Sequence, residues 1–109
     1  MKPVNNIGAN EHTYIYVIYN PERNRSKIGK ANDPKRRLIN LQTGSCDDLE
    51  LAFMVAIEKS KSSQVERLAH KIAVDHGKPK KREWFSRTTA EEAKGYVETA
   101  HELVRGRNT

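Results

Sequence analysis

The chain has 109 residues, of which 20 are lysine or arginine and 14 are aspartate or glutamate, so its formal net charge is +6 at pH 7. That length suits one small domain with a single core, and no stretch approaches the roughly 18 apolar residues of a membrane-spanning helix. The single cysteine excludes an internal disulfide and a cysteine-rich zinc site. The positive charge favours a polyanionic partner such as nucleic acid, although a basic domain without such a partner has the same composition.

The two ends of the chain are polar. Residues 1–12 are expected to form a flexible leader, because they show no apolar periodicity. They also lack the apolar segment of a secretory signal, so we expect a cytoplasmic protein that does not associate with membranes. The domain should span residues 13–105 and leave a polar tail at residues 106–109.

Two short runs rich in β-branched and aromatic residues follow the leader. Residues 14–19 predict a buried strand, and residues 26–30 predict a second strand. Residues 20–24, between them, have the composition of a turn. We therefore expect a β-hairpin in which Tyr14 and Tyr16 lie on the same face of the first strand.

A helix and a third strand come next. Asp33 can cap the helix and Pro34 suits its first turn, while the Thr-Gly-Ser sequence at residues 43–45 should end it. Residues 49–57 form a mostly apolar run that predicts a strand. Because so few of its positions are polar, this strand is expected at the centre of the sheet.

Two longer helices complete the chain. Ser63 and Glu66 have the spacing of a capping box, which predicts a helix that starts at Ser63 and stops at Gly77. Either Thr88 or Thr89 should cap the last helix, since each precedes a glutamate by three residues.

The segment between these helices combines a basic stretch with an apolar patch. Four of the five residues at 78–82 are basic, which indicates a loop, and residues 83–85 could end a strand. The expected fold class is therefore α/β, of the α+β kind, in which a small antiparallel three-stranded sheet is flanked by helices.

The first helix carries a pair of arginines near its start. Arg37 lies about 100° around the helix from Leu38, at the edge of the apolar face, where a side chain can point into a cleft. A guanidinium group can donate two parallel hydrogen bonds to a phosphate. The basic sequence at residues 35–37, taken alone, is also typical of a solvated basic turn.

A carboxylate and an imidazole share one side of the next helix. Glu66 flanks the apolar stripe, and His70 projects from the same side one turn later. A carboxylate is an oxygen ligand of the kind Mg²⁺ prefers, and one carboxylate with water ligands is enough at a phosphate site. In the alternative interpretation, Glu66 only completes the capping box and His70 is a surface residue.

The first two strands also contain candidates for chemistry. Tyr16 could take a proton from an attacking water if neighbouring cations lower the pKa of its hydroxyl, or it could be a core residue. Gly29, between Lys27 and Lys30, would allow a phosphate or another backbone to approach closely.

Several basic residues are candidates for nucleic-acid binding, but a solvated surface is an equal explanation. These residues are Lys30, Arg36, Lys78, Lys80, Lys81 and Arg82. Trp84 and Phe85 could stack on a base, although large apolar residues are scarce in this chain and are more often used in the core.

In combination, these residues resemble the GIY-YIG nuclease superfamily. Tyr14-Ile15-Tyr16 stands where that family has Gly-Ile-Tyr, and Lys27-Ile28-Gly29 stands where it has Tyr-Ile-Gly. Arg37 and Glu66 fall at the positions of the family's phosphate-binding arginine and metal-binding glutamate. The spacing of Glu66 and His70 is similar to that of a phage-type subgroup.

The resemblance implies an endonuclease that hydrolyses DNA phosphodiester bonds with Mg²⁺ or Mn²⁺. It implies that Glu66 holds the metal and that Arg37 stabilises the transition state. Tyr16, helped by Lys27, would steer or deprotonate the water, and His70 would support Glu66 or relay a proton. Lys27 replaces the family's tyrosine, and the family's late asparagine has no clear counterpart, the nearest polar residue being Glu83.

Two functions of other classes remain open. One is a non-catalytic nucleic-acid-binding module on the same scaffold, which the altered second motif favours. The other is a small regulatory or interaction subunit that is basic without binding nucleic acid. If the chain is a nuclease, it has no room for a separate recognition domain, so a homodimer or a partner protein could provide specificity.

Overall fold

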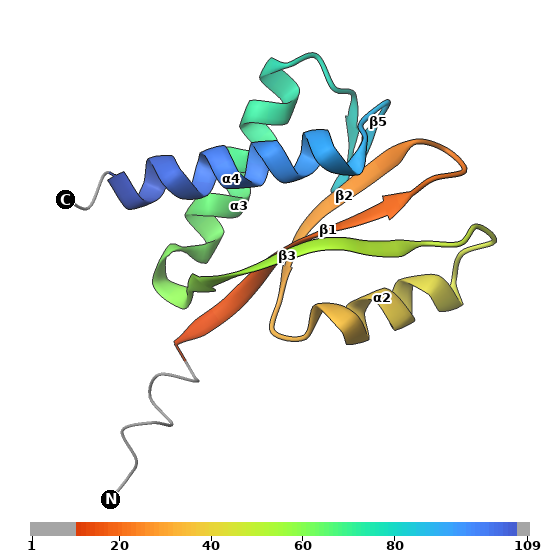
Figure 1. Cartoon of the computed structure of the whole chain (residues 1–109), viewed down its shortest axis with the longest axis horizontal. Coiled ribbons are helices and arrows are strands. Elements are labelled where there is room, and N and C mark those ends of the chain that lie inside the picture. Colours follow the sequence, from red (N-terminus) through yellow and green to blue (C-terminus); the bar gives the residue numbers. More distant parts are fainter. Residues whose placement is uncertain (1–10, 107–109) are drawn as a thin grey trace, which may run out of the picture.

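Residues 11–106 are described by the structure, a computed structural model, and they form an antiparallel sheet with helices on both of its faces (Figure 1). The strands are hydrogen-bonded in the order β3-β1-β2-β5-β4. The elements in chain order are β1 (His12–Asn20), β2 (Arg25–Ala31), α2 (Pro34–Thr43), β3 (Glu50–Glu58), α3 (Lys59–Asp75), β4 (Lys80–Lys81), β5 (Trp84–Ser86) and α4 (Ala90–Gly106). The predicted α+β class is confirmed.

The sheet has five strands, whereas the sequence predicted three. The additional strands, β4 and β5, form a hairpin in which Lys80 pairs with Phe85 and Lys81 pairs with Trp84. They are two and three residues long, which is too short for an alternation of apolar and polar residues to mark them. The segment predicted as a basic loop therefore contains a strand.

Strand β3 occupies an edge of the sheet, so the prediction of a central position is wrong. Its apolar composition has another cause. Phe53 and Val55 pack against the hydrophobic core, while Met54 between them is 39% exposed. Burial of one face is enough to explain such a strand.

Helix α3 begins at Lys59, four residues before the predicted start at Ser63. Its N-cap residue, Glu58, makes no side-chain capping hydrogen bond. Glu66 therefore lies well inside the helix and belongs to no capping box, so the capping explanation of this carboxylate is wrong. The helix stops where predicted, because Gly77 has a φ of 80° that glycine adopts easily.

The caps of the other two helices agree with the sequence. Asp33 accepts a hydrogen bond from the Arg36 backbone N–H at 3.2 Å. Thr89, and not Thr88, caps α4. The Glu92 backbone N–H donates to Thr89 Oγ1 at 3.1 Å, and the Thr89 N–H donates to the Glu92 carboxylate at 2.9 Å.

The expected leader and tail fall mostly outside the described residues. Residues 1–10 and 107–109 are not described, and β1 already begins at His12, inside the expected leader. Within residues 11–106, no helix combines the length and the apolar character needed to cross a membrane.

The two faces of the sheet differ in chemistry. One face packs beneath α3 and α4 and carries the hydrophobic core, which includes Ile15, Val17, Ile28, Val65 and Val97. Alternation along the strands turns the side chains of Tyr14, Tyr16 and Lys27 to the other face. Helix α2 runs along that second face (Figure 1).

Candidate active site

Half of the outer edge of β2 is left uncovered by the sheet. Strand β5 pairs only with Arg25, Ser26 and Lys27, and beyond them the Ile28 N–H donates to the Glu83 carbonyl oxygen at 3.2 Å. After Ile28, no other strand of residues 11–106 pairs with this edge. Side chains of α3 therefore approach the strand here from one face, while α2 lies along the other.

The ring of Tyr16 lies directly over Gly29 in this half of β2. The two residues are paired across β1 and β2, and a methyl group on Gly29 would lie 2.6 Å from the Tyr16 Cζ atom and closer still to the hydroxyl oxygen. The close approach of the ring therefore requires glycine at this position. Tyr16 itself is 1% exposed.

Side chains from four parts of the chain meet around the Tyr16 hydroxyl. Burial raises the pKa of this group above its ordinary value of 10.0, and Arg37 on α2 opposes that rise through hydrogen bonding and charge. The carboxylates of Glu83 and Glu66 raise the pKa further. The condition for Tyr16 to take a proton from water, a pKa lowered by neighbouring cations, is therefore not met, because burial outweighs the nearby cation. The phenol is protonated at neutral pH.

Glu66 lines a cavity of about 320 Å³ together with Ser63, Arg67, His70, Lys80 and Glu83. Burial raises the pKa of its carboxyl above the ordinary 4.5, and Glu83 adds to the rise, while Lys30, Lys27 and Lys80 oppose it. Among residues 11–106, no side chain or backbone group forms a hydrogen bond or ion pair with this carboxylate. Glu66 is thus a half-buried negative charge without a direct partner.

Lys27 is held by Glu83, the residue that the sequence offers in the stretch nearest to the family's late asparagine. The Lys27 Nζ atom lies 2.7 Å from Glu83 Oε1, and the lysine side chain is 8% exposed while the glutamate is 43% exposed. The pair joins β2 to the turn of the β4–β5 hairpin. Only the pairing of strands far apart in sequence brings Glu83 here, so no local pattern marks it.

His70 is fixed in one orientation. Its Nε2–H donates to the Ile28 carbonyl oxygen, with 2.8 Å between the heavy atoms, because a carbonyl can only accept. Its ring meets Phe85 edge to face, with centroids 5.1 Å apart. Burial lowers the pKa of His70 below 6.5, so the imidazole is neutral at pH 7 and Nδ1 carries a lone pair.

Two of the basic residues predicted to bind nucleic acid border the same cavity. Lys80 lines it directly. The Lys30 Nζ atom donates to Ser63 Oγ at 2.7 Å, which holds its charge beside the cavity wall.

The other basic residues lie elsewhere. Lys78 donates to the Arg87 carbonyl oxygen at 2.9 Å and pairs with Glu92 at 3.1 Å, so it braces the start of α4. The remaining predicted residues are exposed on α2 or on the β4–β5 hairpin, and they are Arg36, Lys81 and Arg82.

The carboxylates at this site fit a small divalent cation. Mg²⁺ is commonly bound through one or two carboxylates and keeps several water ligands, and Glu66 and Glu83 lie close enough for each charge to affect the other. Within residues 11–106, no group of three or more histidine, cysteine, aspartate or glutamate side chains could enclose a metal. Water and a substrate phosphate would have to complete the coordination.

Comparison with known proteins gives one match. The family profile described as the T5orf172 domain matches residues 13–105, which include every strand and helix except the ends of β1 and α4. No curated protein and no solved structure matches the chain significantly. The matched segment covers most of the chain and contains all the side chains around the Tyr16 hydroxyl. The chain therefore belongs to the T5orf172 domain family, a phage-associated family related to nuclease-like folds.

Proposed function

We propose that this domain is a divalent-metal-dependent endonuclease of the GIY-YIG type that hydrolyses phosphodiester bonds in DNA. One observation carries the proposal: Arg37, Glu66 and Glu83 all act on the hydroxyl of Tyr16. Each side chain comes from a different element, and α2 and α3 lie on opposite faces of the sheet. A purely structural domain has no need to bring a cation, two carboxylates and a phenol to one sheet edge.

Arg37 and Glu66 have complementary roles in the proposed reaction. The Arg37 guanidinium binds the phosphate that is cut and stabilises the negative charge that develops on it. Glu66, with Glu83 beside it, would hold Mg²⁺ or Mn²⁺, and a bound divalent ion supplies charge stabilisation and lowers the pKa of bound water. Arg37 and Glu66 approach Gly29 from opposite faces of the sheet, which leaves the open edge of β2 between them for the phosphate.

Tyr16 acts as a protonated phenol in this scheme. Since burial keeps its pKa high, the hydroxyl orients the attacking water by hydrogen bonding and does not serve as a preformed phenolate base. His70 positions the edge of β2 through Ile28. Its free Nδ1 can accept a proton or hydrogen bond within the cavity that it shares with Glu66.

A second function is favoured by the ion pair between Lys27 and Glu83. In the resembling nucleases a tyrosine stands at the position of Lys27, and here the lysine ammonium is bound to Glu83 at 2.7 Å. A domain that keeps the scaffold but neutralises this position could bind nucleic acid without cutting it. The retained Glu66 carboxylate argues against this alternative, because negative charge opposes phosphate binding unless a cation is present.

The proposal is tested with supercoiled, linear and branched DNA in the presence of Mg²⁺ or Mn²⁺. The parent protein should cut at least one form, and Glu66→Gln should abolish cutting while DNA binding, measured by fluorescence anisotropy, stays level or rises. Glu98→Gln on the exposed side of α4 is the matched control and should cut normally. Cutting by Glu66→Gln at the parent rate would refute the metal role, and failure of the parent to cut any form would favour the binding module.

The proposed DNA partner has its own test. Because contacts with phosphates release counterions, the logarithm of the binding constant should fall linearly with the logarithm of salt concentration. A salt-independent constant, or no binding at low salt, would instead point to an interaction subunit.

A further inference from the structure

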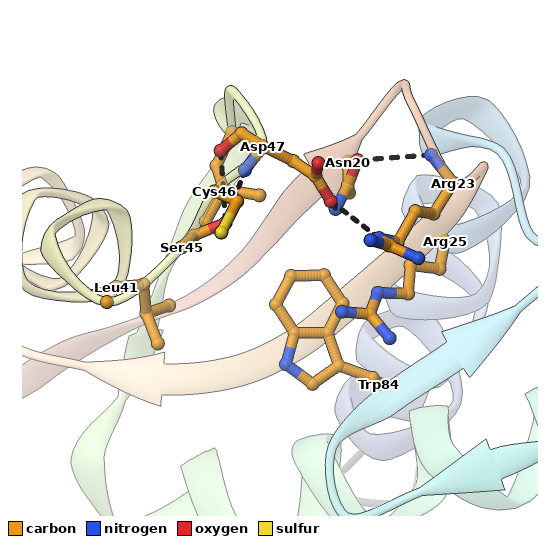
Figure 2. Close-up of a pocket in the computed structure, with 10 residues that line it drawn as sticks. Asn20, Arg23, Arg25, Leu41, Ser45, Cys46, Asp47 and Trp84 are labelled. Atoms are coloured by element: carbon orange, nitrogen blue, oxygen red, sulfur yellow. Dashed lines mark hydrogen bonds and ion pairs between the residues drawn. The ribbon is translucent and has the colours of Figure 1, made fainter.

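A second cavity, of about 330 Å³, lies beside the candidate active site and takes no part in the proposed reaction. Three segments form it: the turn between β1 and β2, the loop between α2 and β3, and the start of β5. Figure 2 shows Trp84 and Arg25 along one side and the loop of Ser45, Cys46 and Asp47 along another. The cavity is large enough to hold one small planar group.

The side of the cavity formed by Trp84 and Arg25 combines an aromatic ring with a cation. The Arg25 guanidinium lies 4.9 Å from the centroid of the Trp84 ring, and Trp84 is half-buried. The Arg25 Nε atom is buried and has no hydrogen-bond partner among residues 11–106. Since buried donors in folded proteins are nearly always paired, an unpaired one indicates a missing acceptor. Aromatic rings and guanidinium groups are also the surfaces on which nucleobases stack.

The opposite wall is polar and held in place by hydrogen bonds. The Asn20 side chain donates to Asp47 Oδ2 at 3.0 Å and accepts from the Arg23 backbone N–H at 3.1 Å, while Arg23 Nε donates to the same Asp47 oxygen. Hydrogen bonds from Asn20 and Arg23 hold the pKa of Asp47 below its ordinary value. This wall therefore offers an ionised acceptor and guanidinium donors to the edge of a bound base.

The cavity lies on the same face of β2 as the proposed scissile phosphate, toward the turn between β1 and β2. Trp84 is paired with Lys27 across β5 and β2. Lys27 is two residues from Gly29, about 6.6 Å along the strand, and Arg25 is two residues further on. Arg25, Lys27 and Gly29 alternate to the same face of β2 as the ring of Tyr16. A DNA strand whose phosphate rests over Gly29 would carry its neighbouring base toward Trp84.

We propose that this cavity binds one unpaired nucleobase of DNA, stacked on Trp84 next to the phosphate that is cut. The inference rests on the proposed nuclease function and names its substrate class: DNA that is single-stranded or locally unpaired at the cut site. A base inside a duplex has both faces covered by its neighbours, so it reaches such a pocket only after leaving the stack. The guanidinium group of Arg25, a residue that lines the cavity, donates to the bound nucleotide.

Trp84 is the only tryptophan of the chain, so its fluorescence reports on this cavity alone. The Glu66→Gln variant prevents cutting during the measurement. Single-stranded oligothymidylate should quench the fluorescence, whereas an oligonucleotide of the same length made of abasic nucleotides should bind through its phosphates without quenching. Anisotropy of labelled strands measures both affinities. Equal effects of the two strands on fluorescence, or tight binding of oligothymidylate without any change, would overturn the proposal.

Substitution of the tryptophan gives a second test. Loss of one base-stacking contact predicts that Trp84→Ala weakens binding of single-stranded DNA by about 5- to 150-fold, while Trp84→Phe keeps most of the affinity. Both variants should bind the abasic strand as the parent does, which shows that they are folded. If Trp84→Ala binds and cuts unpaired DNA like the parent, the pocket assignment is wrong while the nuclease survives. If oligothymidylate quenches Trp84 but the parent cuts no DNA, the nuclease is wrong while the base pocket survives.

Discussion

The two faces of the sheet are built from the same strands but serve different ends. On the face beneath α3 and α4, Ile15, Val17 and Ile28 are completely buried among other apolar side chains. On the face along α2, the alternate residues of the same strands are Tyr16, Lys27 and Gly29. Pro34 is the only residue of α2 that is buried. The first face carries the apolar core, and the second buries a phenol and an ammonium group among its side chains.

This difference makes neighbouring residues separable by experiment. A substitution on the core face should lower stability and spare function, whereas one on the α2 face should do the reverse.

The sharpest comparison uses two adjacent arginines on α2, both of which are exposed. Arg37 acts on the Tyr16 hydroxyl, whereas Arg36 contributes its backbone N–H to the Asp33 cap. Arg37→Ala should reduce the single-turnover cleavage rate by about 100- to 1,000-fold, the usual effect of losing one donor to transition-state charge. Arg36→Ala should only weaken binding slightly. Equal losses in the two variants would mean that Arg37 contributes general charge and no specific contact.

The contact between Gly29 and Tyr16 offers a steric test. Gly29→Ala places a methyl group 2.6 Å from Tyr16 Cζ, so the ring must move. Displacement of a reacting group by about 1 Å can cost 100-fold in rate, and overpacking should lower the free energy of unfolding by about 1–3 kcal/mol. Gly95→Ala in α4, where a methyl group meets nothing within 4 Å, should leave cleavage intact and raise stability by up to about 1 kcal/mol. Normal cleavage by Gly29→Ala would mean that the position of the Tyr16 ring does not matter for the reaction.

Tyr16 and Val17 test the two faces at consecutive positions of β1. Val17→Ala should lower the free energy of unfolding by about 2 kcal/mol, because a fully buried side chain is truncated. Cleavage measured well below the melting temperature should persist. Tyr16→Phe should change stability by about 1 kcal/mol or less, yet slow cleavage about tenfold or more through the lost hydrogen bond. Urea unfolding and a cleavage assay on both variants measure the two effects. Slow cleavage by Val17→Ala, or a large loss of stability in Tyr16→Phe, would contradict the assignment of the two faces.

His70 should show the smallest effect, since it positions β2 and touches no substrate in this account. The Gln side chain places an N–H near the position of Nε2, so His70→Gln should keep the bond to the Ile28 carbonyl and most of the cleavage. His70→Ala loses that bond and about 1 kcal/mol of stability. If Gln and Ala variants are equally inactive while both remain folded, the imidazole itself transfers a proton.

Much of this arrangement could be predicted from local sequence. The strands around Tyr16 and Gly29, the Asp33 cap and the capping box at Thr89 all depend on residues close in sequence. The position of Glu66 beside the apolar stripe of its helix was likewise correct, because helical periodicity does not depend on where the helix begins.

Other features depend on long-range contacts that local patterns do not contain. The apolar run of β3 suits a central or an edge strand equally well, and only the partners of β1 decide between them. α3 has no capping residue at its true start, whereas Ser63 imitates a cap four residues later. Glu83 acquires its role from Lys27, which is 56 residues away. The pKa of Tyr16 is raised because the side chain is buried, whereas the neighbouring cations alone would lower it. Local sequence shows the cations and not the burial.

The central claim is that Glu66 is kept for chemistry at the expense of stability. Burial raises its pKa above 4.5, so its ionisation opposes folding at every pH above the raised value, and this opposition vanishes below the ordinary value, where the carboxyl is neutral in both states.

The direct test is the free energy of unfolding of the parent and of Glu66→Gln between pH 3.5 and 7.5, with cleavage measured on the same samples at neutral pH. Glu66→Gln should be more stable than the parent at pH 7, and the advantage should shrink as pH falls through the raised pKa. Mg²⁺ should stabilise only the parent, and only the parent should cut DNA. A variant that is less stable than the parent at pH 7, or that still cuts DNA, would contradict the account.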